Sequence, residues 1–247
     1  MRIKLTLSYD GTCFCGWQRQ KNGVSVQQTV ENAIFSLTGE KVTVTASGRT
    51  DAGVHALGQV AHFDTNANIP PEKFCKALNT FLPSGVKVLS SEKVSDKFSA
   101  RRDAKRKTYE YSLYLSDSEL PLKERFAARV YGNIDAEKMR SAANLIAGEH
   151  DFKAFSATGG NVKTTVRTVY SVSVEVSGID IKIRVTGGGF LYNMVRIIAG
   201  TLVKIGKGEL PEENVLKAFK TGDRTLLGET LPANGLCLIK VEYGERA

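Results

Sequence analysis

The sequence has few of the residues that build metal centres and disulfide networks. Among its 247 residues there are four cysteines and three histidines. No two cysteines form a Cys-x-x-Cys pair, and a zinc site is typically built from such closely spaced ligands. The composition therefore argues against a metal site, and it favours reduced thiols in a cytoplasmic protein.

Long apolar runs and nucleotide-binding loops are also absent. No hydrophobic stretch is long enough to span a bilayer, and residues 1–5 alternate like a strand, without the apolar centre of a signal peptide. The glycines at 187–189 lack both the Gly-x-Gly-x-x-Gly spacing and the lysine of a P-loop. We interpret them as a flexible turn between a strand and a helix, and we expect no cofactor.

Positive charge, in contrast, is in excess. The net charge is +8 and the pI is about 9.3, which favours a polyanionic partner. Residues 97–107 hold six basic residues and a single acidic one, Asp103. This segment predicts contact with a nucleic-acid backbone, with Arg101, Arg102 and Lys105 as the candidate residues, although a solvated connector would have the same composition.

Hydrophobic periodicity predicts that the first half of the chain mixes strands and helices. Hydrophobic residues make up 42% of the sequence, and the length suits one large domain or two ordinary ones. Strands are expected at residues 3–9, 42–46, 59–63 and 86–94, with helices beginning at Ser25 and Pro71. This order indicates an α+β unit with its helices on one face of a sheet.

The second half has the same mixed character. Strands are expected at residues 109–115, 166–176, 179–185 and 237–243, and helices at 135–148, at 190–205 and from Pro211. Ser177 and Gly178 predict a hairpin between two of these strands, and Phe152 and Phe155 are interpreted as packing residues. Because the basic segment separates the two halves, we expect domains at 1–103 and 104–247.

The most informative stretch is a glycine-rich loop at residues 47–56. It places Asp51 between Gly48 and Gly53 and two residues after Arg49. An aspartate in such a loop often closes a turn or caps a helix. It is also a candidate catalytic carboxylate, and Arg49 beside it offers a planar donor fork suited to phosphate. The residue pattern alone leaves both interpretations open.

This loop resembles the catalytic loop of the tRNA pseudouridine synthase A (TruA) family, whose signature is Gly-Arg-Thr-Asp-Ala-Gly-Val-His. Residues 9–20 resemble a second family segment, Tyr-Asp-Gly-Thr-x-Phe-x-Gly-Trp-Gln-x-Gln. Further matches include Arg196 in a Met-Val-Arg pattern and Tyr109 in a Tyr-x-Tyr pattern, and they continue to residue 235. The resemblance thus covers essentially the whole chain. Before Tyr109 the family pattern is Arg-x-Tyr-x-Tyr, whereas here Lys107 stands at the arginine position.

The resemblance implies a reaction and a role for each matching residue. Asp51 is expected to be the catalytic aspartate, and Arg49 to displace or hold the target nucleotide. Tyr109 is expected to stack on the uracil, and Arg196 to lie beside the catalytic aspartate. The implied fold is α+β, with two related mixed domains, largely antiparallel sheets and an active-site cleft between them. The implied substrate is uridine at positions 38, 39 and 40 of the tRNA anticodon stem-loop, and the implied assembly is a homodimer.

Two other classes of function compete with this one. A non-catalytic tRNA-binding protein or tRNA chaperone could share the fold, because fold does not determine function, but such a protein would be expected to lose Asp51. A metal-dependent nuclease would need a carboxylate cluster, which the sequence does not offer. His55 and His62 are interpreted as structural or RNA-facing residues rather than catalytic ones.

Overall fold

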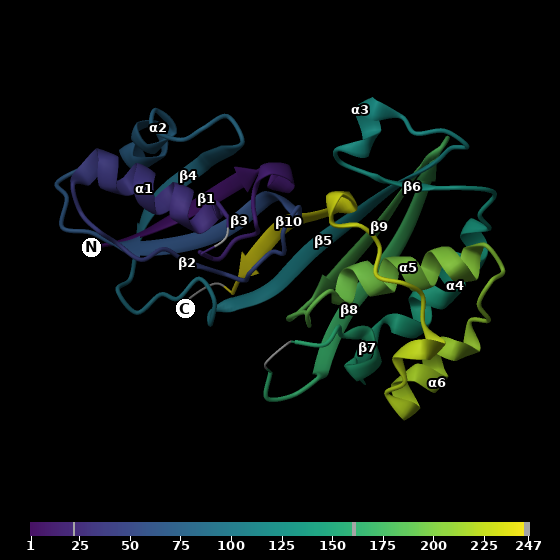
Figure 1. The fold of residues 1–247 in the computed structure, drawn as a ribbon. Helices are drawn as coiled ribbons and strands as arrows, with labels where there is room; N and C mark the ends of the chain where they lie inside the picture. The colour runs from purple at the N-terminus through teal and green to yellow at the C-terminus, as the bar shows by residue number, and fades with distance from the viewer. Residues whose placement is uncertain (22, 160–161, 245–247) are drawn as a thin grey trace. The chain divides into compact units, whose positions relative to one another are not determined.

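The chain folds into two compact units (Figure 1). The computed structural model describes residues 1–21, 23–159 and 162–244. One unit comprises Met1–Lys105 with the segment from Cys237 onward, and the other comprises Arg106–Leu236. From sequence, the last strand was expected in the second domain. In the structure it pairs with a strand of the first unit, because strand partners are chosen by tertiary packing and not by position along the chain.

The first unit is built on a mainly antiparallel sheet. Its strands are β1 (Arg2–Tyr9), β2 (Thr45–Ala46), β3 (His55–Asp64), β4 (Val86–Val94) and β10 (Leu236–Tyr243). β1 lies between β3 and β4 and is antiparallel to both, β2 pairs with β3, and β10 joins β3 in parallel. Alternate residues of β1 are buried, as the sequence predicts, and β4 has the predicted bounds. The strand expected at 42–46 is only the short β2.

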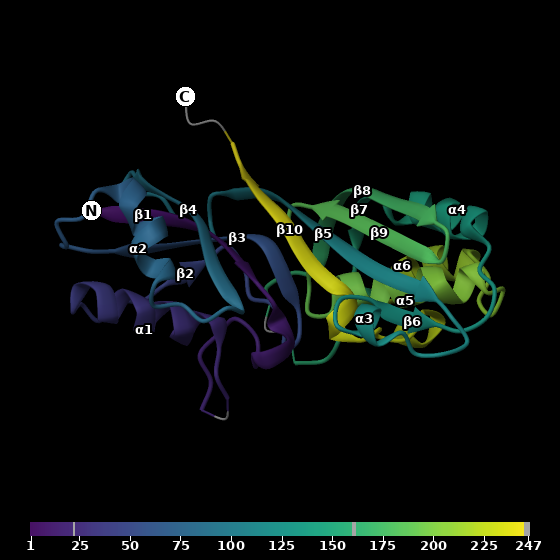
Figure 2. The ribbon, with the colours of Figure 1, turned by 90° about the horizontal axis from the view of Figure 1, so that it is seen from above.

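Helix α1 (Val26–Thr38) covers part of one face of this sheet (Figure 2). The predicted capping at its start is confirmed, because the backbone N–H of Gln28 donates to Ser25 Oγ at 3.2 Å. Gly39 ends the helix with a φ of +74°, a conformation that glycine adopts without strain. Helix α2 (Phe74–Asn79) follows the short 3₁₀ helix η2 (Pro71–Lys73) and packs against β4.

The second unit has its own antiparallel strands and a layer of helices. The strands are β5 (Ala104–Leu115), β6 (Ala128–Val130), β7 (Gly148–Asp151), β8 (Val166–Ser177) and β9 (Asp180–Gly187). They run in the order β5, β9, β8, β7, with β6 parallel to β5. The predicted hairpin is confirmed: β8 and β9 are joined through Gly178, which has a φ of +60°.

The helices of this unit pack on the strands and on one another. They are α3 (Pro121–Glu124), α4 (Ala136–Ile146), α5 (Met194–Gly206) and α6 (Glu213–Thr221). α4 contacts β8, α5 and α6. The fully buried Phe152 and Phe155 pack edge to face at 5.5 Å between centroids, and both contact Phe219. Their interpretation as packing residues is therefore confirmed.

Helix α5 begins later than the sequence predicts. Hydrophobic residues continue from Phe190, but the helix starts at Met194. Asn193 has a φ of +58°, and among the described residues no other non-glycine residue has a positive φ. A left-handed residue cannot continue an α-helix, so residues 190–193 form a turn that leads into α5.

Both units therefore combine helices with mostly antiparallel strands, which confirms the mixed α+β class. The remaining short 3₁₀ helices are η1 (Gly11–Cys13), η3 (Lys153–Phe155), η4 (Arg224–Leu226) and η5 (Ala233–Gly235). Within the described residues, none of the helices is both long and apolar enough to cross a bilayer.

Candidate active site

A hydrogen bond between backbone groups closes a turn in the loop that carries Asp51. The N–H of Val54 donates to the Asp51 carbonyl oxygen at 3.1 Å, and Gly53 lies between them with a φ of +81°. A turn of this kind needs a positive φ at its third residue, which glycine supplies. The backbone of Asp51 closes the turn while its half-buried carboxylate does not. A turn at this position is thus compatible with a chemical role for the side chain.

Buried hydrogen bonds fix the residues before Asp51. Tyr9 Oη lies 2.8 Å from Thr50 Oγ1, and Gln59 Nε2 donates to Tyr9 Oη at 3.3 Å and to the Gly48 carbonyl at 3.0 Å. Ser47 Oγ donates to Gln59 Oε1 at 2.7 Å. Burial raises the pKa of the Tyr9 hydroxyl to about 12, so it remains protonated. These side chains hold the loop in one conformation.

The second matching segment, residues 9–20, lies directly against this loop. The N–H of Trp17 donates to the Thr50 carbonyl at 2.9 Å, and the N–H of Gly53 donates to the Phe14 carbonyl at 3.4 Å. Gly11 passes so close that a Cβ there would lie 2.1 Å from the Val54 carbonyl oxygen. The two sequence motifs are therefore parts of one structural element.

His55 and His62, the two histidines of the first unit, each accept a hydrogen bond from a backbone N–H. The N–H of Gly11 donates to His55 Nδ1 at 3.0 Å, and the N–H of Ala100 donates to His62 Nδ1 at 3.2 Å. A ring nitrogen that accepts a hydrogen bond carries a lone pair and no proton. His55 Nδ1 also lies 3.2 Å from a carboxylate oxygen of Asp10. Burial is the main cause that lowers the pKa of His62.

Arg49 and Arg101, from two distant segments, line the same cavity. It has a volume of about 210 Å³. Its other lining residues are Trp17, Gln18, Gln27, Thr43, Val44, Thr45, Ala46 and Gly48. Arg102 and Lys105, the other two candidates from the basic segment, do not line it. One residue of the glycine-rich loop and one residue of the basic segment thus line the same cavity.

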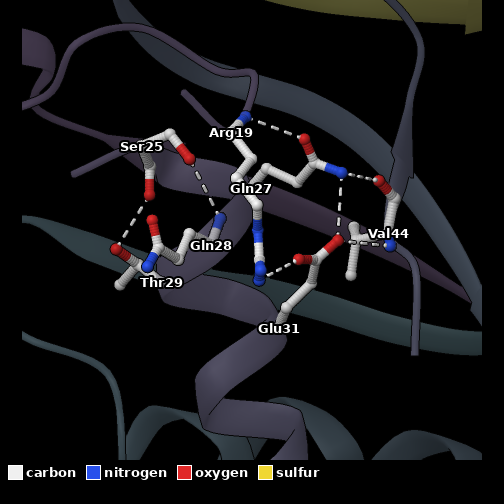
Figure 3. A network of polar contacts seen from close by, with 7 residues as sticks. All are labelled: Arg19, Ser25, Gln27, Gln28, Thr29, Glu31 and Val44. Atoms are coloured by element: carbon white, nitrogen blue, oxygen red, sulfur yellow. Dashed lines mark hydrogen bonds and ion pairs between the residues drawn. The ribbon is translucent and has the colours of Figure 1, made fainter. Parts of the chain in front are cut away.

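A polar network holds Gln27 and Val44, two of the residues that line this cavity (Figure 3). Glu31 accepts hydrogen bonds from Arg19 Nη2 at 2.7 Å, from Gln27 Nε2 at 3.0 Å and from the N–H of Val44 at 3.0 Å. Gln27 in turn donates to the Val44 carbonyl at 3.2 Å. Sequence reasoning misses Glu31. The available signal was its position between Val30 and Ala33 on the buried side of α1, where a carboxylate needs partners.

Tyr109 and Tyr111, in β5 of the second unit, have different surroundings. Tyr109 is 8% exposed, and its ring meets the ring of Phe190 edge to face at 5.2 Å. Tyr111 is fully buried and its hydroxyl donates to the Pro232 carbonyl at 2.6 Å. Burial raises the pKa of Tyr111. Tyr111 is therefore the core tyrosine of the pair, and Tyr109 remains the candidate for substrate binding.

Arg196 lies in the first turn of α5 and is half-buried. Its Nε donates to the Leu231 carbonyl at 2.6 Å, and its Nη1 donates to Asn193 Oδ1 at 2.8 Å. These bonds attach the start of the helix to the segment around Leu231 and hold the left-handed Asn193. Arg196 thus has a structural role, which was not apparent from the sequence.

No group of three or more His, Cys, Asp or Glu side chains suited to a metal ion occurs within the described residues. The four cysteines, all of them described, form no disulfide with one another.

Comparison with known proteins identifies the family. A family model described as tRNA pseudouridine synthase matches residues 6–102 and 142–244. A tRNA pseudouridine synthase A of Ruminiclostridium cellulolyticum is 46% identical over 243 residues, which cover 98% of this chain and 99% of the relative. A tRNA pseudouridine synthase A 2 of Clostridium perfringens is 45% identical over 241 residues, with the same coverage. A tRNA pseudouridine synthase A of Geobacter sp. (strain M21) is 45% identical over 244 residues, again with 98% and 99% coverage.

These matches place the chain among the isomerases that modify RNA. Within that class, the chain belongs to the tRNA pseudouridine synthase family. The resemblance to this family, based on residues 9–20 and on the glycine-rich loop at 47–56, is confirmed.

Proposed function

We propose that this protein converts uridine to pseudouridine in the anticodon stem-loop of tRNA, at positions 38, 39 and 40. The observation that carries the proposal is the full-length identity of 46% to a tRNA pseudouridine synthase A, together with a complete Gly48–His55 loop. A non-catalytic tRNA-binding protein would not need Asp51, and its retention favours an enzyme.

The reaction needs a carboxylate but no external donor of atoms or electrons. The bond between N1 of uracil and C1′ of ribose breaks, the base turns, and a bond forms between C5 and C1′. The proton on C5 is lost and N1 gains one, so substrate and product are isomers. Asp51 acts either as a nucleophile toward the sugar or base, or as a base on the ribose.

Three further residues are assigned to the same reaction. We propose that Arg49 holds the target nucleotide outside its stack, since chemistry on a base requires its extrusion. Tyr109 packs on the uracil, and its fixed edge-to-face contact with Phe190 supports a defined ring orientation. Arg196 binds substrate next to Asp51. The family resemblance is also the basis for proposing two related domains with the active site between them, a homodimer and a cytoplasmic location.

Asp51→Asn tests the proposal. Because the turn uses the Asp51 backbone carbonyl, asparagine preserves the loop while removing the charge. Pseudouridine formation in tRNA transcripts should vanish while tRNA affinity changes less than threefold. The assay is run in excess chelator without nucleotide, with each target uridine read separately. The Arg49→Gln and Arg196→Lys variants should lower turnover less than Asp51→Asn does.

The controls separate the competing explanations. Wild-type protein that binds tRNA but forms no pseudouridine would support the non-catalytic alternative. Activity that magnesium restores, at fixed tRNA structure, would show that a metal takes part. Substantial turnover by Asp51→Asn, in a preparation free of wild-type enzyme, would show that a residue other than Asp51 carries out the chemistry.

A further inference from the structure

Gln59 is a fully buried polar side chain in an apolar layer. It lies in β3 on the same face as Ala61 and Phe63, because residues two apart in a strand share a face. All three are at most 1% exposed, and the ring of Phe63 packs on that of Phe74 in α2 at 5.7 Å between centroids. An amide in such surroundings costs free energy unless its polar atoms are hydrogen-bonded. Its partners therefore determine its role.

The hydrogen bonds of the Gln59 amide fix its orientation. Nε2 donates to the Gly48 carbonyl at 3.0 Å and to Tyr9 Oη at 3.3 Å, and Oε1 accepts from Ser47 Oγ at 2.7 Å. A carbonyl oxygen only accepts, so the atom beside Gly48 must be the amide nitrogen. The opposite orientation would place two acceptor oxygens against each other. Both N–H donors of the amide are thus in use.

This orientation also fixes the hydroxyl proton of Tyr9. Tyr9 Oη accepts from Gln59 Nε2, and its second neighbour is Thr50 Oγ1 at 2.8 Å. Among the described residues, Tyr9 Oη has no third hydrogen-bond partner. Since the hydroxyl has one proton and Tyr9 is buried, that proton is donated to Thr50 Oγ1. A pKa of about 12 keeps it in place at neutral pH.

One amide therefore holds both neighbours of Arg49. It binds the Gly48 carbonyl directly, and it holds the Thr50 side chain through Tyr9. Thr50 immediately precedes Asp51, whose backbone carbonyl closes the turn of the loop. A rotation of the backbone at either neighbour of Arg49 would break one of these bonds.

We propose that Gln59 is a positioning residue of the active site, which fixes the backbone that carries Arg49 and Asp51. It acts through Gly48, Tyr9 and Thr50 and does not touch the substrate, because it is 0% exposed. The inference rests on the proposed function, since it takes Arg49 and Asp51 to act on the target nucleotide. It adds a residue of β3 to those on which the reaction depends.

Gln59→Met tests the proposal, because methionine is similarly long and unbranched but cannot make these hydrogen bonds. The single-turnover rate of pseudouridine formation should fall by about 10²-fold, as expected when a catalytic group is displaced by about 1 Å. Affinity for tRNA should stay within about threefold of the wild type, because an effect on positioning appears in the rate and not in binding.

Ser91→Ala is the matched control for lost stability. Ser91 lies in β4 of the same unit and is 8% exposed. Its Oγ accepts from the N–H of Cys75 at 2.8 Å and donates to the Pro71 carbonyl at 2.7 Å. Neither partner belongs to the loop. Both variants should unfold at lower urea concentration than the wild type, and only Gln59→Met should lose turnover under conditions in which both are folded.

Amide hydrogen exchange gives a readout that does not depend on activity. The N–H of Val54 closes the turn, and the N–H of Trp17 binds the Thr50 carbonyl. Relative to the amides of β1, both should exchange at least about tenfold faster in Gln59→Met. In Ser91→Ala the same ratio should equal that of the wild type.

The link through Tyr9 is tested by a double-mutant cycle. Tyr9→Phe and Thr50→Val each remove the same hydrogen bond, so the double variant should lose no more turnover than the more impaired single variant. Thr50→Ser keeps the hydroxyl and should retain most of the wild-type rate.

Three results would overturn the proposal: wild-type turnover in Gln59→Met, wild-type exchange of its loop amides, or additive losses in the Tyr9 and Thr50 variants. A wild-type protein that forms no pseudouridine, although its loop amides respond to Gln59→Met as expected, would overturn the proposed function and leave the ordering of the loop by Gln59 intact. The two failures are therefore distinguishable.

Discussion

Gly11→Ala is the sharpest perturbation that the structure suggests at the candidate site. An alanine Cβ at this position would lie 2.1 Å from the Val54 carbonyl oxygen, and ordinary contact begins at 3.4 Å. The two atoms must therefore separate by 3.4 − 2.1 = 1.3 Å. The obstacle is backbone, so no side chain can rotate away, and the segment around Gly11 and the turn closed by Asp51 and Val54 must shift apart.

The shift should affect activity more than stability. Overpacking of this kind typically costs about 1–3 kcal/mol of folding free energy. Misplacing a catalytic group by 1 Å can lower turnover by about 10²-fold. We therefore expect a protein that still folds and loses about two orders of magnitude in single-turnover pseudouridine formation.

Gly39→Ala is the matched control for the loss of stability. Gly39 has a φ of +74° with no atom within 4 Å of an added Cβ, so alanine is strained there without displacing a neighbour. The left-handed conformation should cost about 1–2 kcal/mol, and turnover should remain at the wild-type level. Urea unfolding measures the stability of both variants, and turnover is compared well below their midpoints. Wild-type turnover in Gly11→Ala would refute the claim that this contact positions the catalytic loop.

Two further predictions concern the tyrosines and a histidine. Tyr111→Phe should lose about 1–2 kcal/mol of stability, because the Pro232 carbonyl loses its donor, and should keep its turnover. Tyr109→Phe should show the reverse in the same urea and turnover assays if the Tyr109 hydroxyl, and not only its ring, acts on the uracil. His62 has a lowered pKa in the folded state, so the unfolded chain binds the proton first and stability should fall as pH decreases below about 6.5. His62→Gln should reduce this slope in urea titrations across pH 5–7, and an identical slope would assign the dependence to other groups.

The features that sequence predicts well are those set by neighbouring residues. Ser25, Gln28 and Gly39 define both ends of α1, and each acts through a bond or a conformation within a few residues. Asn193 shows the limit of local reasoning. An apolar run from Phe190 looks helical, and a left-handed asparagine that ends the pattern has no reliable sequence signal.

Features that depend on distant partners were not predictable. Glu31 is a carboxylate on a buried helix face, and only the fold supplies Arg19 and the Val44 backbone as its partners. The same holds for Arg101, which lines the same cavity as Arg49 although the two lie 52 positions apart in the chain (101 − 49). The basic segment indicated a nucleic acid, but charge alone could not select which of its residues would face the catalytic loop.

The packing of residues 9–20 against the glycine-rich loop at 47–56 separates the residues that the fold requires from the residue that is the candidate for the chemistry. Gly11 has an ordinary φ, so its own conformation would accept a side chain, and glycine is needed there because the Val54 backbone passes it. Gly16 combines a φ of +102° with a carbonyl 2.7 Å from any added Cβ. A non-catalytic protein with this fold would need both glycines in order to pack the loop. The carboxylate of Asp51, in contrast, does not close the turn, which uses the backbone carbonyl. The glycines are therefore required by the fold, whereas Asp51 remains the candidate for the chemistry.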